Sequence, residues 1–85
     1  MDIIYTSKFA REYKKLPKAV KPLAEKREGI FRKNPFEPTL DTHKLHGRLK
    51  DFWSFSIGFK YRIIFEFSEK NIAHFHSVGD HDIYQ

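Results

Sequence analysis

The hydrophobic residues near the start of the chain recur at the spacing of an α-helix. Over residues 8–15 a single apolar stripe is flanked by lysine and arginine, and its members at i, i+4 and i+7 are Phe9, Tyr13 and Leu16. Thr6 or Ser7 can cap the first turn with a side-chain oxygen. The pattern therefore predicts an amphipathic, basic helix, and the run "DIIYT" at residues 2–6 predicts a short strand before it.

A second helix is predicted after Pro17. Its apolar positions again fit a period of 3.6 residues, and they are Val20, Leu23, Ala24, Ile30 and Phe31. Pro22 lacks an N–H, and its ring would clash in a helix begun at Pro17, so we expect the regular part to start near residue 20. The segment "NPFEP" at residues 34–38 ends the helix, because a residue before proline is biased away from the helical conformation. The two helices would form a helical hairpin.

From residue 48 onward the hydrophobic period changes from 3.6 to 2, which is typical of β-strands. Three such runs are present, at residues 48–57, 60–67 and 71–78. Their short connections, one of them at Gly58-Phe59, predict an antiparallel meander. The core-facing residues of the first two runs are expected to be Leu49, Trp53, Phe55, Ile57, Tyr61, Ile63, Phe65 and Phe67.

Together these elements predict an α+β fold for a single domain over residues 1–85. We expect an N-terminal strand and a helical hairpin packed on one face of a four-stranded, mainly antiparallel sheet that includes that strand. The helices cover one face only, so the opposite face, with Ser54, Ser56 and Arg62, is expected to stay partly open. Nine Phe, four Tyr, one Trp and no Cys predict an aromatic-rich core without disulfides.

Positive charge is concentrated in the first part of the chain. Residues 1–33 hold ten Lys/Arg against four Asp/Glu, whereas the other 52 residues hold six against seven. This distribution indicates a partner rich in phosphate or carboxylate, and the alternative is a solvated helical face. The N-terminus lacks the order of a signal peptide, and no apolar run is long enough to span a membrane, so we expect a cytoplasmic protein.

Five histidines are the main candidates for chemistry, and they are His43, His46, His74, His76 and His81. A zinc site would need three or four ligands at short spacings, and neither an HExxH motif nor a cysteine pair is present. His74 and His76 share one face of a strand, but we expect them to be packed or solvated there. No metal and no other cofactor is expected.

Histidine and arginine can instead cleave RNA without a metal. The reaction needs a base for the 2′-hydroxyl proton, an acid for the leaving 5′-oxygen and a cation on the phosphate. His43, His81 and Arg62 match these three roles. The alternative for Arg62 is a cross-strand ion pair with one of three carboxylates, those of Glu66, Asp51 and Asp80.

Four segments, in their order and spacing, resemble the RelE/ParE superfamily of toxins from type II toxin–antitoxin modules, and most closely its YafQ/YoeB/HigB-like mRNA interferase branch. The segments are "HKLHG", "FWSFSI", "YRIIFEF" and "GDHDIY", and the resemblance covers essentially the whole chain. It implies a small cytoplasmic endoribonuclease that cuts mRNA, in association with the ribosome, and that a cognate antitoxin silences in a hetero-oligomeric complex.

The resemblance also implies roles for single residues. His43 falls at a general base, Arg62 at a phosphate-contacting arginine, and His81 at a terminal histidine that acts as acid or contacts the scissile phosphate. Tyr84 corresponds to a nearby aromatic residue that orients or stacks on a base. Which histidine is the base and which the acid stays open. The residues expected to contact RNA are Lys44, Arg48, Lys50 and Lys60.

The chain departs from YafQ-like proteins at two positions. Their mid-strand histidine aligns near Ser56, and the acid of their strand hairpin aligns near Lys60, so the proton-transfer set differs. Asp80 and Asp82 have no assigned role. The alternative functions are a ParE-like inhibitor of DNA gyrase, whose relatives lack the histidine and arginine set, and a non-toxic protein that only binds its antitoxin.

Overall fold

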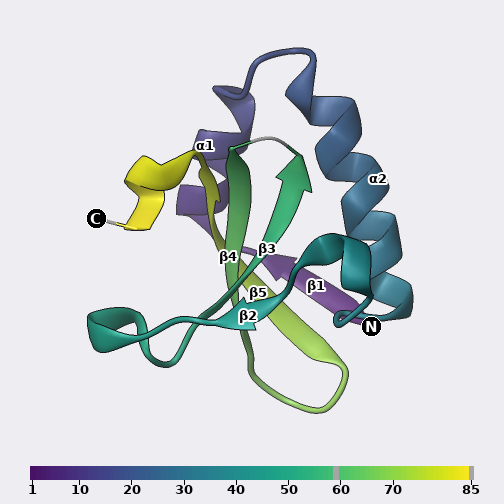
Figure 1. Cartoon of the computed structure of the whole chain (residues 1–85), viewed down its shortest axis with the longest axis vertical. Coiled ribbons are helices and arrows are strands. Elements are labelled where there is room, and N and C mark those ends of the chain that lie inside the picture. Colours follow the sequence, from purple (N-terminus) through teal and green to yellow (C-terminus); the bar gives the residue numbers. More distant parts are fainter. Residues whose placement is uncertain (59, 85) are drawn as a thin grey trace.

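Five strands form one mixed sheet in the computed structural model of the chain, which describes residues 1–58 and 60–84 (Figure 1). The strands are β1 (Asp2–Tyr5), β2 (His43–Lys44), β3 (Trp53–Gly58), β4 (Tyr61–Phe67) and β5 (Ile72–Gly79). Their order across the sheet is β1-β5-β4-β3-β2. β1 runs parallel to β5, and the remaining neighbours are antiparallel. The predicted α+β fold and the antiparallel meander are confirmed.

The prediction of four strands is wrong, because β2 adds a fifth at the edge of the sheet. β2 has only two residues, His43 and Lys44, which pair with Ser54 and Trp53 of β3. A run of two residues is too short for a period of 2 to be recognised in the sequence. This strand carries His43 to the edge of the sheet.

The two helices begin and end close to their predicted positions. α1 (Ser7–Lys14) starts after Thr6, whose hydroxyl oxygen accepts a hydrogen bond from the Phe9 N–H at 3.0 Å. α2 (Val20–Lys33) holds Pro22 in its first turn, where an N–H needs no partner within the helix. Among the residues that the structure describes, no helix has both the length and the apolar character that crossing a bilayer requires.

Aromatic rings form the centre of the core between the helices and the sheet. Phe31 of α2 is fully buried, and its ring centroid lies 4.9 Å from that of Phe55, 4.9 Å from that of Phe65 and 5.3 Å from that of Phe75. Phe9 of α1 also packs on Phe75, with ring centroids 5.5 Å apart. The helices therefore cover the sheet face from which Phe55, Phe65 and Phe75 project, as the parity of β3 and β4 predicted for Phe55 and Phe65.

The strand predicted over residues 48–57 begins five residues later than its sequence pattern suggested. β3 starts at Trp53, and the preceding residues form a 3-10 turn, η2 (Gly47–Leu49), in which Gly47 has a φ of +68°. That left-handed conformation breaks the extended backbone, so Leu49 leaves the predicted core face. The predicted turn at Gly58-Phe59 includes Phe59, which lies outside the described residues, as does Gln85 at the end of the chain.

Candidate active site

The sheet face opposite the helices, here called the outer face, carries four of the polar residues that the sequence singled out. His43 pairs with Ser54, and Arg62 pairs with Ser56 on β3 and with Gly79 on β5. Residues directly opposite each other on antiparallel strands project to the same face. Because Ser54 and Phe55 are consecutive, Ser54 projects away from the helices. His43 and Arg62 therefore share the outer face.

The end of the chain folds back over this face. Residues His81–Tyr84 form a short 3-10 helix, η3, which is the yellow turn at the left of Figure 1. The Tyr84 hydroxyl lies 2.9 Å from the Ser54 hydroxyl, and the two form a hydrogen bond. The rings of His81 and Tyr84 have centroids 6.1 Å apart. The structure thus brings Tyr84, with His81 beside it, to the strand partner of His43.

Asp80 and Gly79 hold the turn in place. The Asp80 carboxylate accepts a hydrogen bond from the Asp82 N–H at 3.0 Å, and its other oxygen lies 4.0 Å from the Lys60 ammonium. At Gly79 a Cβ would lie 2.6 Å from a methyl carbon of Ile83, so only glycine lets the turn pack this closely. Asp80, which the sequence left without a role, therefore shapes the turn, and Asp82 is exposed.

Arg62 is half-buried and pairs with Gly79, just before the C-terminal turn begins. Of the three carboxylates considered as its partners, Glu66 binds His76, with Oε1 2.9 Å from Nε2, and Asp80 faces Lys60. Within residues 1–58 and 60–84 no carboxylate oxygen lies within 4.0 Å of the Arg62 guanidinium. Its donors are consequently available to an anion on the outer face.

The tautomer of His43 follows from a contact with its own loop. His43 is exposed, and its Nδ1 lies 3.0 Å from the carbonyl oxygen of Asp41. A carbonyl oxygen can only accept, so Nδ1 carries the proton. In the neutral ring Nε2 is then the basic nitrogen, and it is the atom able to take a proton from a substrate.

The four residues expected to contact RNA are exposed but do not all gather at this site. Lys44 pairs with Trp53, and its ammonium lies 6.0 Å from the centroid of the indole ring. The Lys44 side chain therefore points away from the outer face, which carries His43. Lys60 lies near Asp80 at the turn. Arg48 is part of η2, and Lys50 follows it in the same loop.

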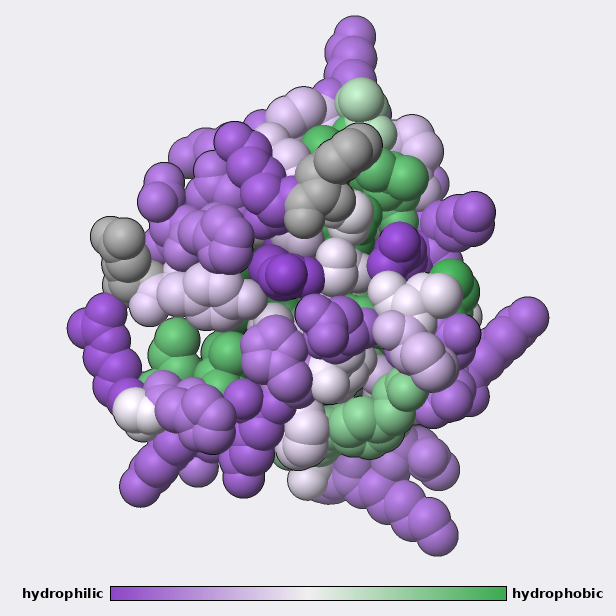
Figure 2. Space-filling view, in the orientation of Figure 1, coloured by the Kyte–Doolittle hydropathy of each residue, from purple (hydrophilic) through white to green (hydrophobic). Residues whose placement is uncertain are grey.

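A pocket of about 230 Å³ lies on the outer face between η3 and the loop around η2. It is lined by Lys8, Leu49, Phe52, Ile64, His76, Ser77 and Ile83. Figure 2 shows hydrophobic surface recessed between the hydrophilic C-terminal turn and the hydrophilic loop below it. The sequence pattern did not predict this pocket. The available signal was Ile64, a large apolar residue on the polar parity of its strand.

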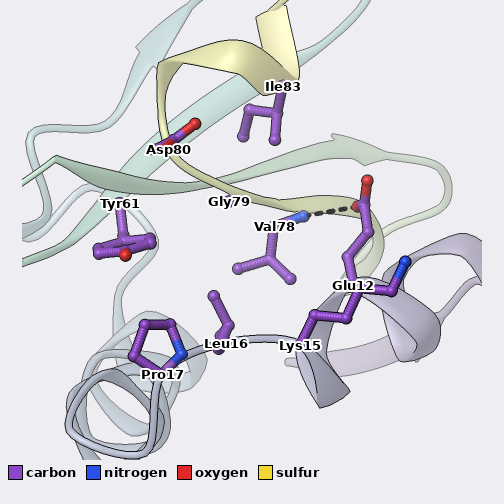
Figure 3. A pocket seen from close by; sticks show the side chains of 9 residues that line it. All are labelled: Glu12, Lys15, Leu16, Pro17, Tyr61, Val78, Gly79, Asp80 and Ile83. Carbon is purple, nitrogen blue, oxygen red and sulfur yellow. Dashed lines mark hydrogen bonds between the residues drawn. The ribbon is translucent and has the colours of Figure 1, made fainter.

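A second hollow, of about 370 Å³, lies on the other side of the turn, between the end of α1 and the end of β5. Figure 3 shows Val78 between Ile83, which lies above it, and Leu16, which lies below it beside Pro17. Ile83 also lines the first pocket, so η3 separates the two hollows.

The chemistry that these side chains can supply is acid–base catalysis assisted by a cation. His43 and His81 can move protons, and Arg62 can hold a phosphate oxygen. In the described part of the chain no group of three or more His, Asp or Glu side chains is placed to hold a metal ion.

No protein-family model matches the sequence, and no curated protein sequence matches it. Solved structures do match the fold. YafQ from E. coli strain BL21(DE3) has a TM-score of 0.80 and 18% identity, over 98% of this chain and 96% of that one. A YoeB/ParE toxin from Agrobacterium tumefaciens has a TM-score of 0.78 and 14% identity, over 95% and 99%. YafQ in the E. coli DinJ–YafQ toxin–antitoxin complex has a TM-score of 0.77 and 19% identity, over 96% and 93%.

These likenesses span nearly the full length of both partners, and they show that the chain has the fold of YafQ and YoeB. The resemblance stated from the sequence segments is therefore supported at the level of the fold. At identities below 20%, the activity of those proteins does not transfer with the fold.

Proposed function

We propose that this chain is the toxin of a type II toxin–antitoxin system and a metal-independent endoribonuclease that cuts mRNA, in association with the ribosome. The observation that carries the proposal is the hydrogen bond between Tyr84 and Ser54. Because of it, the turn that holds His81 lies over the face that carries His43 and Arg62. The fold shared with YafQ and YoeB supports the same function.

In the proposed reaction His43 is the general base. Its Nε2 takes the proton of a ribose 2′-hydroxyl, and the oxygen attacks the adjacent phosphorus. Arg62 donates hydrogen bonds to the phosphate oxygens, whose charge grows in the transition state. His81, in its protonated form, gives a proton to the leaving 5′-oxygen. The bond to that oxygen breaks, and a 2′,3′-cyclic phosphate and a 5′-hydroxyl remain. Tyr84 orients a base beside the reacting phosphate.

The proposed partner that silences the toxin is an antitoxin protein in a hetero-oligomeric complex. YafQ, whose fold this chain shares, has been solved bound to DinJ in a toxin–antitoxin complex. The net charge of +5 fits a partner with acidic segments, as well as RNA.

The test is cleavage of an mRNA by the purified protein, with and without translating ribosomes. We expect His43→Ala, Arg62→Ala and His81→Ala each to lower the single-turnover rate about 100-fold or more, with the fold retained. His46→Ala is the matched control, since His46 is an exposed histidine in the loop just after β2, and it should keep the wild-type rate. Full activity in the three site variants would refute the site. Supercoiling defects in expressing cells, without mRNA cleavage, would favour a gyrase inhibitor instead.

A further inference from the structure

The pocket on the outer face is built from five separate parts of the chain. Its lining comes from α1 (Lys8), the loop around η2 (Leu49 and Phe52), β4 (Ile64), β5 (His76 and Ser77) and η3 (Ile83). Ile64 is only 4% exposed. Ile64 is also the strand neighbour of Ser54, and Ile83 lies between His81 and Tyr84 in sequence. The pocket therefore adjoins the proposed catalytic residues.

The lining combines aromatic and apolar walls with fixed polar groups. His76 is held by Glu66, whose Oε1 lies 2.9 Å from Nε2, and its ring meets that of Phe52 edge to face, with centroids 4.9 Å apart. The Lys8 ammonium donates to the Ser77 hydroxyl at 3.3 Å. A flat, polar-edged aromatic molecule suits such a site, because its faces contact apolar and aromatic groups while its edges meet hydrogen-bonding groups.

We propose that this pocket binds one nucleobase of the RNA, on the nucleotide next to the phosphate that Arg62 contacts. This assignment rests on the proposed function for the identity of the RNA. A base is favoured over an apolar side chain of a protein partner, because the Lys8 ammonium and the His76 ring bring hydrogen-bonding groups that an apolar side chain would leave unused. His76 then reads the edge of the base, and Phe52 contacts its face.

Titration of the ¹⁵N-labelled protein with nucleoside 5′-monophosphates tests the pocket without requiring cleavage. Ribose 5-phosphate is the control, since it carries the sugar and phosphate without a base. We expect the nucleotides to shift the amide signals of Ile64, His76 and Ser77, and ribose 5-phosphate to leave them in place. Equal shifts with both ligands, or none at these residues, would overturn the assignment and leave an apolar protein side chain as the occupant.

Two variants and a matched control sharpen the test. Leu49→Trp fills the pocket, His76→Gln removes the ring, and His74→Gln changes the neighbouring histidine, which does not line the pocket. We expect the first two to weaken nucleotide binding about tenfold and the third to leave it unchanged. Equal binding in all three would also overturn the assignment. If the wild-type protein shows base-dependent shifts but no cleavage, the ribonuclease proposal fails while the base site stands.

Discussion

At the scale of the residue, the hydroxyl of Ser54 connects the sheet to the end of the chain. Ser54 lies on the outer face, yet it is 0% exposed, because Tyr84 covers it and bonds its hydroxyl at 2.9 Å. A buried hydroxyl without a partner destabilises the folded state, so each of these two residues depends on the other. The same bond sets the position of His81, three residues before Tyr84 in the turn.

A double-mutant cycle measures this dependence. We expect Ser54→Ala and Tyr84→Phe each to lower the free energy of unfolding by about 1 kcal/mol, and the double variant to lose clearly less than the sum. Denaturation in urea gives the three values. Fully additive losses would contradict a direct bond. In a cleavage assay both single variants should also slow the reaction, since the turn that carries His81 would be less fixed.

At the scale of the element, α1 takes the place of a missing strand beside β5. β1 ends at Tyr5, so the last residues of β5 have no strand on that side. Glu12 of α1 supplies the partner, since its Oε1 accepts from the Ser77 hydroxyl at 2.7 Å and from the Val78 N–H at 3.1 Å (Figure 3 shows the second bond). Both donors belong to residues that are 2% exposed. An acceptor at this position is therefore required.

Glu12→Ala should lower the free energy of unfolding by about 1–3 kcal/mol, because it leaves the Val78 N–H and the Ser77 hydroxyl buried without an acceptor. Glu25→Ala is the control. Glu25 is an exposed carboxylate on α2, and its loss should change the free energy by less than about 0.5 kcal/mol. Urea denaturation of the three proteins gives the comparison, and equal stabilities would show that water replaces Glu12 at the edge of β5.

The contact between β1 and α2 depends on pH. Burial and a 2.6 Å hydrogen bond donated to Glu28 raise the pKa of Tyr5 above its ordinary value of 10.0. The unfolded chain then loses this proton at a lower pH than the folded protein does. The contribution of Tyr5 to the free energy of unfolding is complete below pH 10, and it is lost as the pH rises through the raised pKa of Tyr5. Between pH 9 and 11 the free energy of unfolding of Tyr5→Phe should therefore fall less steeply than that of the wild type. Parallel curves would contradict this contribution of Tyr5.

At the scale of the whole molecule, the sequence predicted what depends on local periodicity. Thr6 as a helix cap, the start of α2 near residue 20 and the alternating residues of β4 all follow from neighbours in sequence. The position of the C-terminal turn over the outer face does not follow from neighbours in sequence. It depends on a hydrogen bond between Ser54 and Tyr84, thirty positions later. The pocket beside it likewise needs five distant segments to converge, and no local pattern encodes that.

The positive charge is divided between two sides of the molecule. Lys26 and Lys33 are exposed on α2, which packs on the sheet face opposite the outer face. Arg48 and Lys50 are exposed in the loop that borders the outer-face pocket. Of these two pairs, only Arg48 and Lys50 lie near the proposed binding site of the RNA. The charge of α2 would therefore act on a larger polyanion, such as the ribosome, rather than on the RNA that is cut.

Two charge reversals of equal size separate these roles. Arg48→Glu with Lys50→Glu should weaken binding of a short single-stranded RNA and lower the slope of log Kd against log salt concentration by about 0.7 for each lost phosphate contact. Lys26→Glu with Lys33→Glu should leave that binding within about twofold, and should weaken co-sedimentation with ribosomes, because α2 faces away from the RNA. If both pairs weakened short-RNA binding equally, the charge would act as one diffuse field, and the division between the two faces would be wrong.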